Sequence, residues 1–344
     1  MPTIELRSDN AAGVTPEILD AIAAANAGSA LAYGGDPLTS ALEHVVRRVF
    51  EHPTARAFPV TSGTAANALA LSALCPPWGA VLSHETAHVL NSECGATSLL
   101  GGGAVLRGLP GDDFKIGGDA LQRALDSAGW GDPHHSQPSV LSLTQATDMG
   151  TIYTVDEVAA LAAIARDHGM RVHLDGARVA NALAALRCSP ADLTWRAGVD
   201  ALTLGAIKNG ALSAEAIVVF DDAAAEELVY RTKRAGHVTS KLRFQSAQLV
   251  AYLTGDRWRR TAADANARMT QLAAGLARLG VRFLNEPQVN MLFAEVSDEV
   301  AARLEGAGLL FYRSGPGVIR LVTSWQTTED DIDVALSAFE AALG

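Results

Sequence analysis

The chain is poor in cysteine, aromatic residues and basic runs, and each scarcity argues against a class of protein. Its only cysteines are Cys75, Cys94 and Cys188, and without a CxxC spacing they indicate reduced core residues of a cytoplasmic protein. Aromatic residues make up 6% of the 344 residues, too few to favour a base-stacking surface. The net charge of −11, without a long basic run, argues against nucleic acid or an anionic membrane as a partner.

Long apolar runs are also missing. The first nine residues lack the apolar core of a signal peptide, and the apolar segment 216–220 is far too short to cross a bilayer. We therefore expect neither export nor membrane insertion. Hydrophobic residues nevertheless make up 49% of the chain, enough for a substantial core in one large domain or two smaller ones.

Strand-like and helix-like segments alternate, which predicts an α/β fold with a mostly parallel sheet. Segment 154–168 is the clearest helix, because Thr154 and Glu157 form a capping box and Gly169 ends it. From about residue 255 the pattern changes to a long helix, short strands and a closing helix. We expect a large domain over 16–254 and a smaller α+β domain over 255–344.

A lysine and an aspartate each end a predicted strand. Asp175 ends the apolar segment 171–175, and Lys208 ends the apolar segment that starts at Val199. Parallel sheets present ligands at the carboxyl ends of their strands, where both side chains would meet. This pair suits pyridoxal phosphate, because the lysine can hold the aldehyde covalently and the aspartate can keep the pyridine nitrogen protonated. Taken singly, Asp175 is also typical of a turn cap paired with Arg178, and Lys208 of a surface lysine.

The segment Thr61-Ser-Gly-Thr-Ala-Ala-Asn67 joins a predicted strand to a predicted helix. Ser62 and Thr64 offer hydroxyl groups, Gly63 permits a close approach of the backbone, and a helix N-terminus favours an anion. The segment therefore predicts a phosphate site, with an unliganded helix cap as the ordinary alternative. The chain has no GxxxxGK[ST] motif, so a nucleoside triphosphate site is unsupported.

A second motif predicts different chemistry. His84-Glu-Thr-Ala-His88 matches HExxH, the signature of zinc peptidases. That motif works only on a helix, whereas the preceding segment 79–83 is typical of a strand running into a turn. A zinc hydrolase is therefore the weaker alternative, and we expect no metal.

In order and spacing, these segments resemble the threonine aldolase and β-eliminating lyase family of pyridoxal phosphate enzymes. The resemblance runs from Leu6 to about Thr323 and implies fold type I, the aspartate-aminotransferase-like fold. The matching pieces are 6–9 (Leu-Arg-Ser-Asp), 33–37 (Tyr-Gly-Gly-Asp-Pro), 62–67, His88 with Glu93, 173–178, Lys208 and 320–323 (Arg-Leu-Val-Thr). The segments 145–147 (Gln-Ala-Thr) and 323–325 (Thr-Ser-Trp) look most like the low-specificity L-threonine aldolase and phenylserine aldolase branch.

The resemblance implies how the cofactor is held. Lys208 is its covalent anchor, Asp175 pairs with the pyridine nitrogen, and His88 stacks on the ring and is a candidate base. Gly63 and Thr64, together with Ser62, hold the phosphate. Arg178 lies near the phenolic oxygen, and Arg243 is a further cofactor-binding residue.

The resemblance also implies how the substrate is held. Ser8 and Arg320, helped by Arg178, bind its carboxylate, which makes residues 1–15 an N-terminal arm that contributes to the site. Tyr33 and Arg243 are expected to reach across a subunit interface, in a homodimer or homotetramer with shared active sites.

The implied reaction is the retro-aldol cleavage of a small β-hydroxy-α-amino acid, such as L-threonine, L-allo-threonine or phenylserine, to glycine and an aldehyde. β-Elimination or transamination could use the same residues and stays open, as does a non-catalytic or regulatory relative that keeps the fold. The family's Thr-His-Asn segment is replaced here by 144–150. The group that takes the β-hydroxyl proton is therefore open among His88, His84, Asp148 and water.

Overall fold

The computed structural model describes residues 3–344, so the first two residues of the predicted arm lie outside the described residues. Its largest sheet has seven strands in the order β2-β8-β7-β6-β5-β3-β4. Only β8 runs against the others, because it pairs antiparallel with both β7 and β2. The predicted α/β class with a mostly parallel sheet is confirmed. The strands are β2 (Arg56–Val60), β3 (Gly79–His84), β4 (Val105–Leu109), β5 (Gln137–Thr144), β6 (Arg171–Gly176), β7 (Ala201–Leu204) and β8 (Glu215–Val219).

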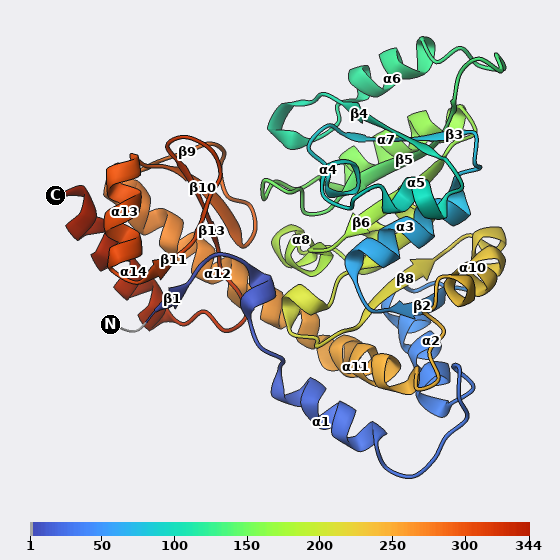
Figure 1. Cartoon of the computed structure of the whole chain (residues 1–344), viewed down its shortest axis with the longest axis horizontal. Coiled ribbons are helices and arrows are strands. Elements are labelled where there is room, and N and C mark those ends of the chain that lie inside the picture. Colours follow the sequence, from blue (N-terminus) through green and yellow to red (C-terminus); the bar gives the residue numbers. More distant parts are fainter. Residues whose placement is uncertain (1–2) are drawn as a thin grey trace.

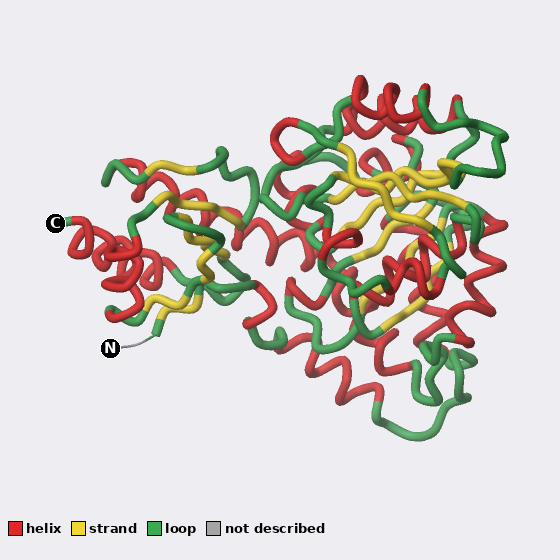
Figure 2. The backbone as a smooth tube through the Cα atoms, turned by 45° about the horizontal axis from the view of Figure 1, so that its top comes forward, coloured by secondary structure: helices red, strands yellow, loops and turns green. Residues whose placement is uncertain are grey.

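Helices enclose this sheet on both faces (Figure 2). Successive strand residues point to opposite faces, so Val140 enters the core under α3 and α10 while Leu141 enters the core under α2, α7, α8 and α11. The helices are α1 (Pro16–Ala25), α2 (Pro37–Val49), α3 (Gly63–Leu74), α4 (His88–Asn91), α5 (Ala96–Leu100), α6 (Gly118–Asp126), α7 (Val155–Asp167), α8 (Val179–Leu186), α9 (Pro190–Leu193), α10 (Asp222–Arg234) and α11 (Arg243–Leu253).

Helix α7 begins and ends where its capping residues predict. Thr154 accepts a hydrogen bond from the amide of Glu157, and the Glu157 side chain accepts one from the amide of Thr154. The helix ends at Asp167, and Gly169 has φ 71°, the left-handed conformation that glycine adopts without cost. The predicted capping box is confirmed.

A second group of elements forms a separate lobe (Figure 1). Its antiparallel sheet has the order β12-β13-β10-β9, and its core is built from side chains such as Leu272, Leu292 and Phe339. Helix α12 packs against both α8 of the large lobe and α14 of this one. The elements are α12 (Arg257–Arg278), β9 (Arg282–Phe283), β10 (Met291–Glu295), α13 (Asp298–Gly306), β11 (Leu309–Leu310), β12 (Tyr312–Arg313), β13 (Val318–Val322) and α14 (Glu329–Leu343).

The N-terminal segment belongs to this second lobe. Strand β1 (Ile4–Glu5) pairs in parallel with β11, and Ile4 and Leu6 are buried in the same core as α14. Sequence patterns did not indicate this strand, because two residues are too few for a recognisable alternation. The pairing anchors the chain directly before Ser8.

Two sequence predictions need correction. Lys208 does not end a strand, because β7 stops at Leu204 and the lysine lies on the short 3-10 turn η4 (Ile207–Asn209). Cys94 is exposed and Cys188 is partly exposed, so only Cys75 is a core cysteine. Cys94 has φ 50° and lies in a turn at the surface, so its side chain is exposed to solvent. Within the described residues, no helix is long and apolar enough to cross a membrane.

Candidate active site

A cavity of about 290 Å³ lies where the carboxyl ends of β5 and β6 meet β13 of the second lobe. Its walls bring together residues that are far apart in the sequence. Of the predicted site residues, those that line the cavity are Ser8, Gly63, Thr64, His88, Asp148, Asp175, Arg178, Lys208 and Arg320. The fold therefore brings these predicted residues together around one cavity.

Helix α3 points its N-terminus at this cavity. Its first intrahelical hydrogen bond runs from the amide of Ala66 to the carbonyl of Ser62, so the amides of Gly63 and Thr64 precede it. The Ser62 hydroxyl accepts a hydrogen bond from the amide of Ala65 at 3.2 Å. Ser62 thus caps the helix and does not line the cavity, whereas Gly63 and Thr64 face it.

The HExxH match does not form a helical metal site. His84 is the last residue of β3 and His88 the first of α4, so the two imidazoles do not share one helix face. His84 Nδ1 instead lies 2.8 Å from the Thr86 hydroxyl, and His84 does not line the cavity. Across residues 3–344 no group of three His, Cys, Asp or Glu side chains could hold a metal ion.

Tyr33 and Arg243 do not line the cavity. Tyr33 is 58% exposed, and its amide donates to the carbonyl of Ser240 at 3.4 Å. Arg243 begins α11, and its Nε donates to the carbonyl of Ala25 at 3.1 Å. The two residues predicted to reach across a subunit interface therefore do not lie at this chain's own cavity.

Asp175 is held in the cavity wall by a network that the sequence analysis missed. Its Oδ1 accepts from the amide of Ala177 at 3.1 Å, and its Oδ2 accepts from Asn67 Nδ2 at 2.9 Å. The same Asn67 nitrogen donates to Glu93 Oε1 at 2.8 Å. Asn67 and Glu93 fall within the motifs that carried the resemblance, but their spacing did not reveal that one would join Asp175 to the other.

His88 completes that network. Its Nδ1 lies 2.9 Å from Glu93 Oε1, and its backbone amide donates to Asp148 Oδ2 at 2.9 Å. The hydrogen bond to Glu93 raises the pKa of His88 despite its partial burial, and the Asp148 charge adds to the effect. Burial raises the pKa of Asp148, and the nearby Asp175 charge raises it further. The cavity thus contains two groups whose pKa values are raised above their ordinary values.

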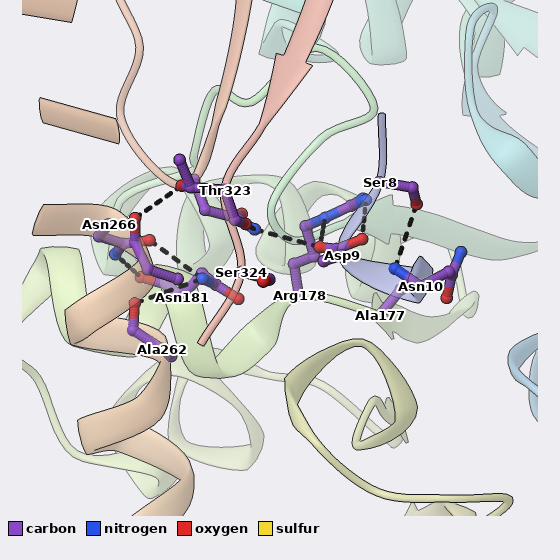
Figure 3. A network of polar contacts seen from close by, with 12 residues as sticks. Ser8, Asp9, Asn10, Ala177, Arg178, Asn181, Ala262, Asn266, Thr323 and Ser324 are labelled. Carbon is purple, nitrogen blue, oxygen red and sulfur yellow. Dashed lines mark hydrogen bonds and ion pairs between the residues drawn. The ribbon is translucent and has the colours of Figure 1, made fainter. Parts of the chain in front are cut away.

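Arg178 pairs with Asp9, and not with Asp175 as the ordinary alternative for these two residues has it. Its Nε and Nη2 donate to the two Asp9 oxygens at 2.7 and 2.9 Å, and Asn290 Nδ2 donates to Asp9 Oδ2 at 3.1 Å. Figure 3 shows the two side chains facing each other beside Ser8 and Asn10. Burial alone would raise the pKa of Asp9, but the charge and hydrogen bonds of Arg178 hold it below its ordinary value.

Arg320 provides a second cation with spare donors. Its Nη2 donates to the carbonyl of Arg7 at 3.0 Å, while its buried Nε has no hydrogen-bond partner within residues 3–344. Burial and the charge of Arg178 lower the pKa of Arg320. The Ser8 hydroxyl accepts from the amide of Asn10 at 3.2 Å and keeps its own proton to donate. This end of the cavity therefore suits an anionic group.

Comparison with known proteins identifies the family in line with this geometry. Residues 5–299 match the β-eliminating lyase family, and the chain belongs to that family. Within it, the chain is 40% identical to the low specificity L-threonine aldolase of Pseudomonas aeruginosa over 328 residues, 94% of each chain. The structure superposes on Leishmania major threonine aldolase with a TM-score of 0.94 at 26% identity, covering all of both chains. Thermus thermophilus aspartate aminotransferase, 18% identical with a TM-score of 0.71 over 99% and 91% of the chains, shares the fold. The predicted family and fold type are confirmed.

Proposed function

We propose that the chain is a pyridoxal-phosphate-dependent lyase that cleaves β-hydroxy-α-amino acids of the threonine or phenylserine type to glycine and an aldehyde. One observation carries this proposal: a single cavity contains a lysine, a buried aspartate, an open helix N-terminus and an arginine with a spare donor. The names of the similar aldolases support the same reaction. No observation favours β-elimination over it, and the separated histidines of the HExxH motif do not favour a zinc hydrolase.

The residues present fit the proposed cofactor. A Cβ atom on Gly63 would meet nothing within 4 Å, so open space lies before the N-terminus of α3, where the amides of Gly63 and Thr64 would hold a phosphate. Asp175 would hold the proton of the pyridine nitrogen, and Lys208 would be the covalent anchor. Bound pyridoxal phosphate supplies the electron sink for the charge that develops on Cα when the Cα–Cβ bond breaks.

The cation-rich end of the cavity orients the substrate. Arg320 and the Ser8 hydroxyl bind the carboxylate through charge-assisted hydrogen bonds, which are shorter and stronger than neutral ones. Arg178 adds positive charge while Asp9 holds its guanidinium in one orientation. Fixing the carboxylate sets which substituent of Cα faces His88, so binding energy is converted into orientation.

His88 is the proposed acceptor of the β-hydroxyl proton. Glu93 accepts a hydrogen bond from Nδ1, which leaves the other ring nitrogen of the neutral imidazole as an acceptor toward the cavity. Asp148 is a second candidate acceptor, because burial raises its pKa and one of its oxygens remains available after binding the His88 amide. His84 does not line the cavity, which argues against it as the acceptor.

The proposed assembly is a homodimer or homotetramer with shared active sites. Tyr33 and Arg243 support this, because Tyr33 is exposed, Arg243 is partly exposed and neither lines the cavity of its own chain. We further propose residues 1–15 as an arm serving the site, 16–254 as the large domain and 255–344 as the small one. The free cysteines support a reducing compartment, and we propose the cytoplasm.

The test is direct product analysis. Purified protein loaded with pyridoxal phosphate is incubated with L-threonine, L-allo-threonine and phenylserine, and glycine and the trapped aldehyde are quantified. We expect equimolar glycine and aldehyde from at least one of the three. Formation of a 2-oxo acid and ammonia instead would show β-elimination, and no product from any of them would overturn the proposal.

A further inference from the structure

Glu215 is a buried acid that lies behind the turn carrying Lys208. It begins β8 and is 5% exposed. Its Oε2 accepts a hydrogen bond from the amide of Ala206 and its Oε1 one from the amide of Ile207, each at 3.1 Å. These are the two residues directly before Lys208. One carboxylate therefore fixes the orientation of both peptide groups that lead into the lysine.

The position of β8 explains why the side chain can do this. Ala216 pairs with Leu204, the last residue of β7, so Glu215 lies just beyond the end of the strand that leads to Lys208. On the other side Glu215 pairs with Val60, the last residue of β2 before the segment that enters α3. The rest of β8 is apolar and buried, and an acid at this depth is costly unless its oxygens are bound. The side-chain hydrogen bonds of Glu215 therefore go to the turn before Lys208 and not to the strands of the sheet.

Two uncharged side chains, Tyr252 and Asn209, form hydrogen bonds on the opposite side of the same turn. The Tyr252 hydroxyl donates to the carbonyl of Gly205 at 3.0 Å and accepts from Asn209 Nδ2 at 2.9 Å. The same Asn209 nitrogen donates to the carbonyl of Trp258 at 2.7 Å. Hydrogen bonds therefore hold the turn from both sides. Those from Glu215 involve a group that can gain or lose a charge, whereas those from Tyr252 and Asn209 involve uncharged groups.

Glu215 changes its charge near neutral pH. Burial raises the pKa of Glu215 to about 7, although the Lys208 charge and the two amides oppose the rise. The ionisable groups that face it are Lys208 on η4, Asp175 on β6 and Tyr252 on α11. When Glu215 is ionised, both oxygens accept an amide proton. When it is protonated, one oxygen carries a proton of its own toward an amide, and one of the two bonds is lost.

We propose that Glu215 is a positioning residue, whose carboxylate holds the turn so that Lys208 presents its amine to the cavity. Glu215 does not line that cavity and acts through the lysine. This inference deepens the proposed function, because it rests on Lys208 being the covalent anchor of pyridoxal phosphate. It predicts that retention of the cofactor depends on the charge of Glu215.

The test measures the dissociation constant of pyridoxal phosphate by equilibrium dialysis of the holoenzyme between pH 6 and 8.5. Glu215→Gln keeps the shape, removes the charge and places an amide donor opposite a backbone donor. We expect Kd to rise about tenfold at pH 8, since a hydrogen bond to a charged group is lost. In the wild type, Kd rises as the pH falls through the Glu215 pKa of about 7, and Glu215→Gln lacks this step.

Tyr252→Phe is the matched control, because it removes a buried hydrogen bond from the same turn without a change of charge. It should keep the pH step of the wild type. The inference is overturned if Glu215→Gln binds the cofactor like the wild type at pH 8, or if it retains the step. Should Glu215→Gln fail to fold, the absence of a step near pH 7 in both the wild type and Tyr252→Phe would overturn it equally.

A separate measurement keeps this inference distinct from the proposed function. Borohydride treatment of the wild-type holoenzyme, followed by peptide mass spectrometry, should find the cofactor fixed to Lys208. If it is fixed elsewhere, the proposed function fails. If it is on Lys208 while Glu215→Gln behaves like the wild type, only the role of Glu215 fails.

Discussion

The buried pair of Asp9 and Arg178 offers a test of how the two lobes are held together. We consider Asp9→Asn, which keeps the shape of the side chain but removes its charge. Arg178 is 8% exposed in its side chain, so it would remain as a buried cation close to Arg320. Breaking a buried pair by removing one partner costs about 3–5 kcal/mol, and we expect about 3 kcal/mol because asparagine keeps one acceptor oxygen.

That loss converts into a measurable change in melting temperature. The unfolding entropy of a chain of 344 residues is roughly 0.7 kcal/mol per kelvin, so a loss of about 3 kcal/mol lowers Tm by about 4 °C. The effect should depend on pH in a definite direction. The pKa of Asp9 is lowered in the folded state, so its stabilisation is present above the ordinary carboxyl pKa of 3.8 and is lost as the pH falls through the folded value.

Differential scanning calorimetry of the cofactor-stripped wild type and variant, at several pH values from 2.5 to 8, measures this difference and its loss at low pH. The matched control is Asp298→Asn, which removes an exposed partner of Arg313 (Asp298 side chain 78% exposed) and should leave Tm within experimental error. Equal melting temperatures of Asp9→Asn and the wild type throughout this range would refute the reasoning.

Three further predictions concern the chemistry of the cavity. Lys208→Ala should lose bound cofactor colour and turnover, whereas Lys115→Ala, which removes a lysine bound to Glu157, should keep both; a yellow and active Lys208→Ala protein would contradict the assignment. Because the pKa of His88 is raised and its neutral form accepts the proton, kcat should rise with pH through a value above 6.5. Glu93→Gln should move that inflection to lower pH, and a pH–rate profile that is identical in both proteins would remove Glu93 from this role. Arg320→Gln should raise KM for the amino acid about tenfold to a hundredfold with a smaller change in kcat, and an unchanged KM would exclude it from carboxylate binding.

Sequence patterns predicted the elements that depend on local spacing. The helix after Thr154 and the alternation of strands and helices follow from capping residues and from periodic apolar positions, which act over a few residues. The prediction of a strand that ends in Lys208 was wrong, because it also relied on local apolar spacing alone. The apolar positions continue past Leu204, but the pairing with β8 stops there and the backbone turns into η4. Local apolar spacing cannot show where a partner strand ends.

At the candidate site, too, local sequence patterns predicted some features, and contacts between distant residues decided the others. Asp175, Lys208 and the 62–64 segment were predicted because their residue types follow strands and so meet at one edge of a parallel sheet. The hydrogen bond from Asn67 to Asp175 spans 108 positions of the chain and was not predicted. The pairing of β1 beside β11, which anchors Ser8 near Arg320, was also missed, because it is decided by a neighbour about 300 residues away.

The family, the α/β class and the kinds of chemical groups at the site follow from the order of the amino acids, because motif order and apolar periodicity are properties of the linear chain. Which of these groups pair with one another follows from the three-dimensional fold. Arg178 binds Asp9 across 169 positions, and Glu215 binds the turn before Lys208 from a neighbouring strand. Those choices depend on strand order and on the cost of leaving a buried charge without a partner, and neither can be read from local spacing.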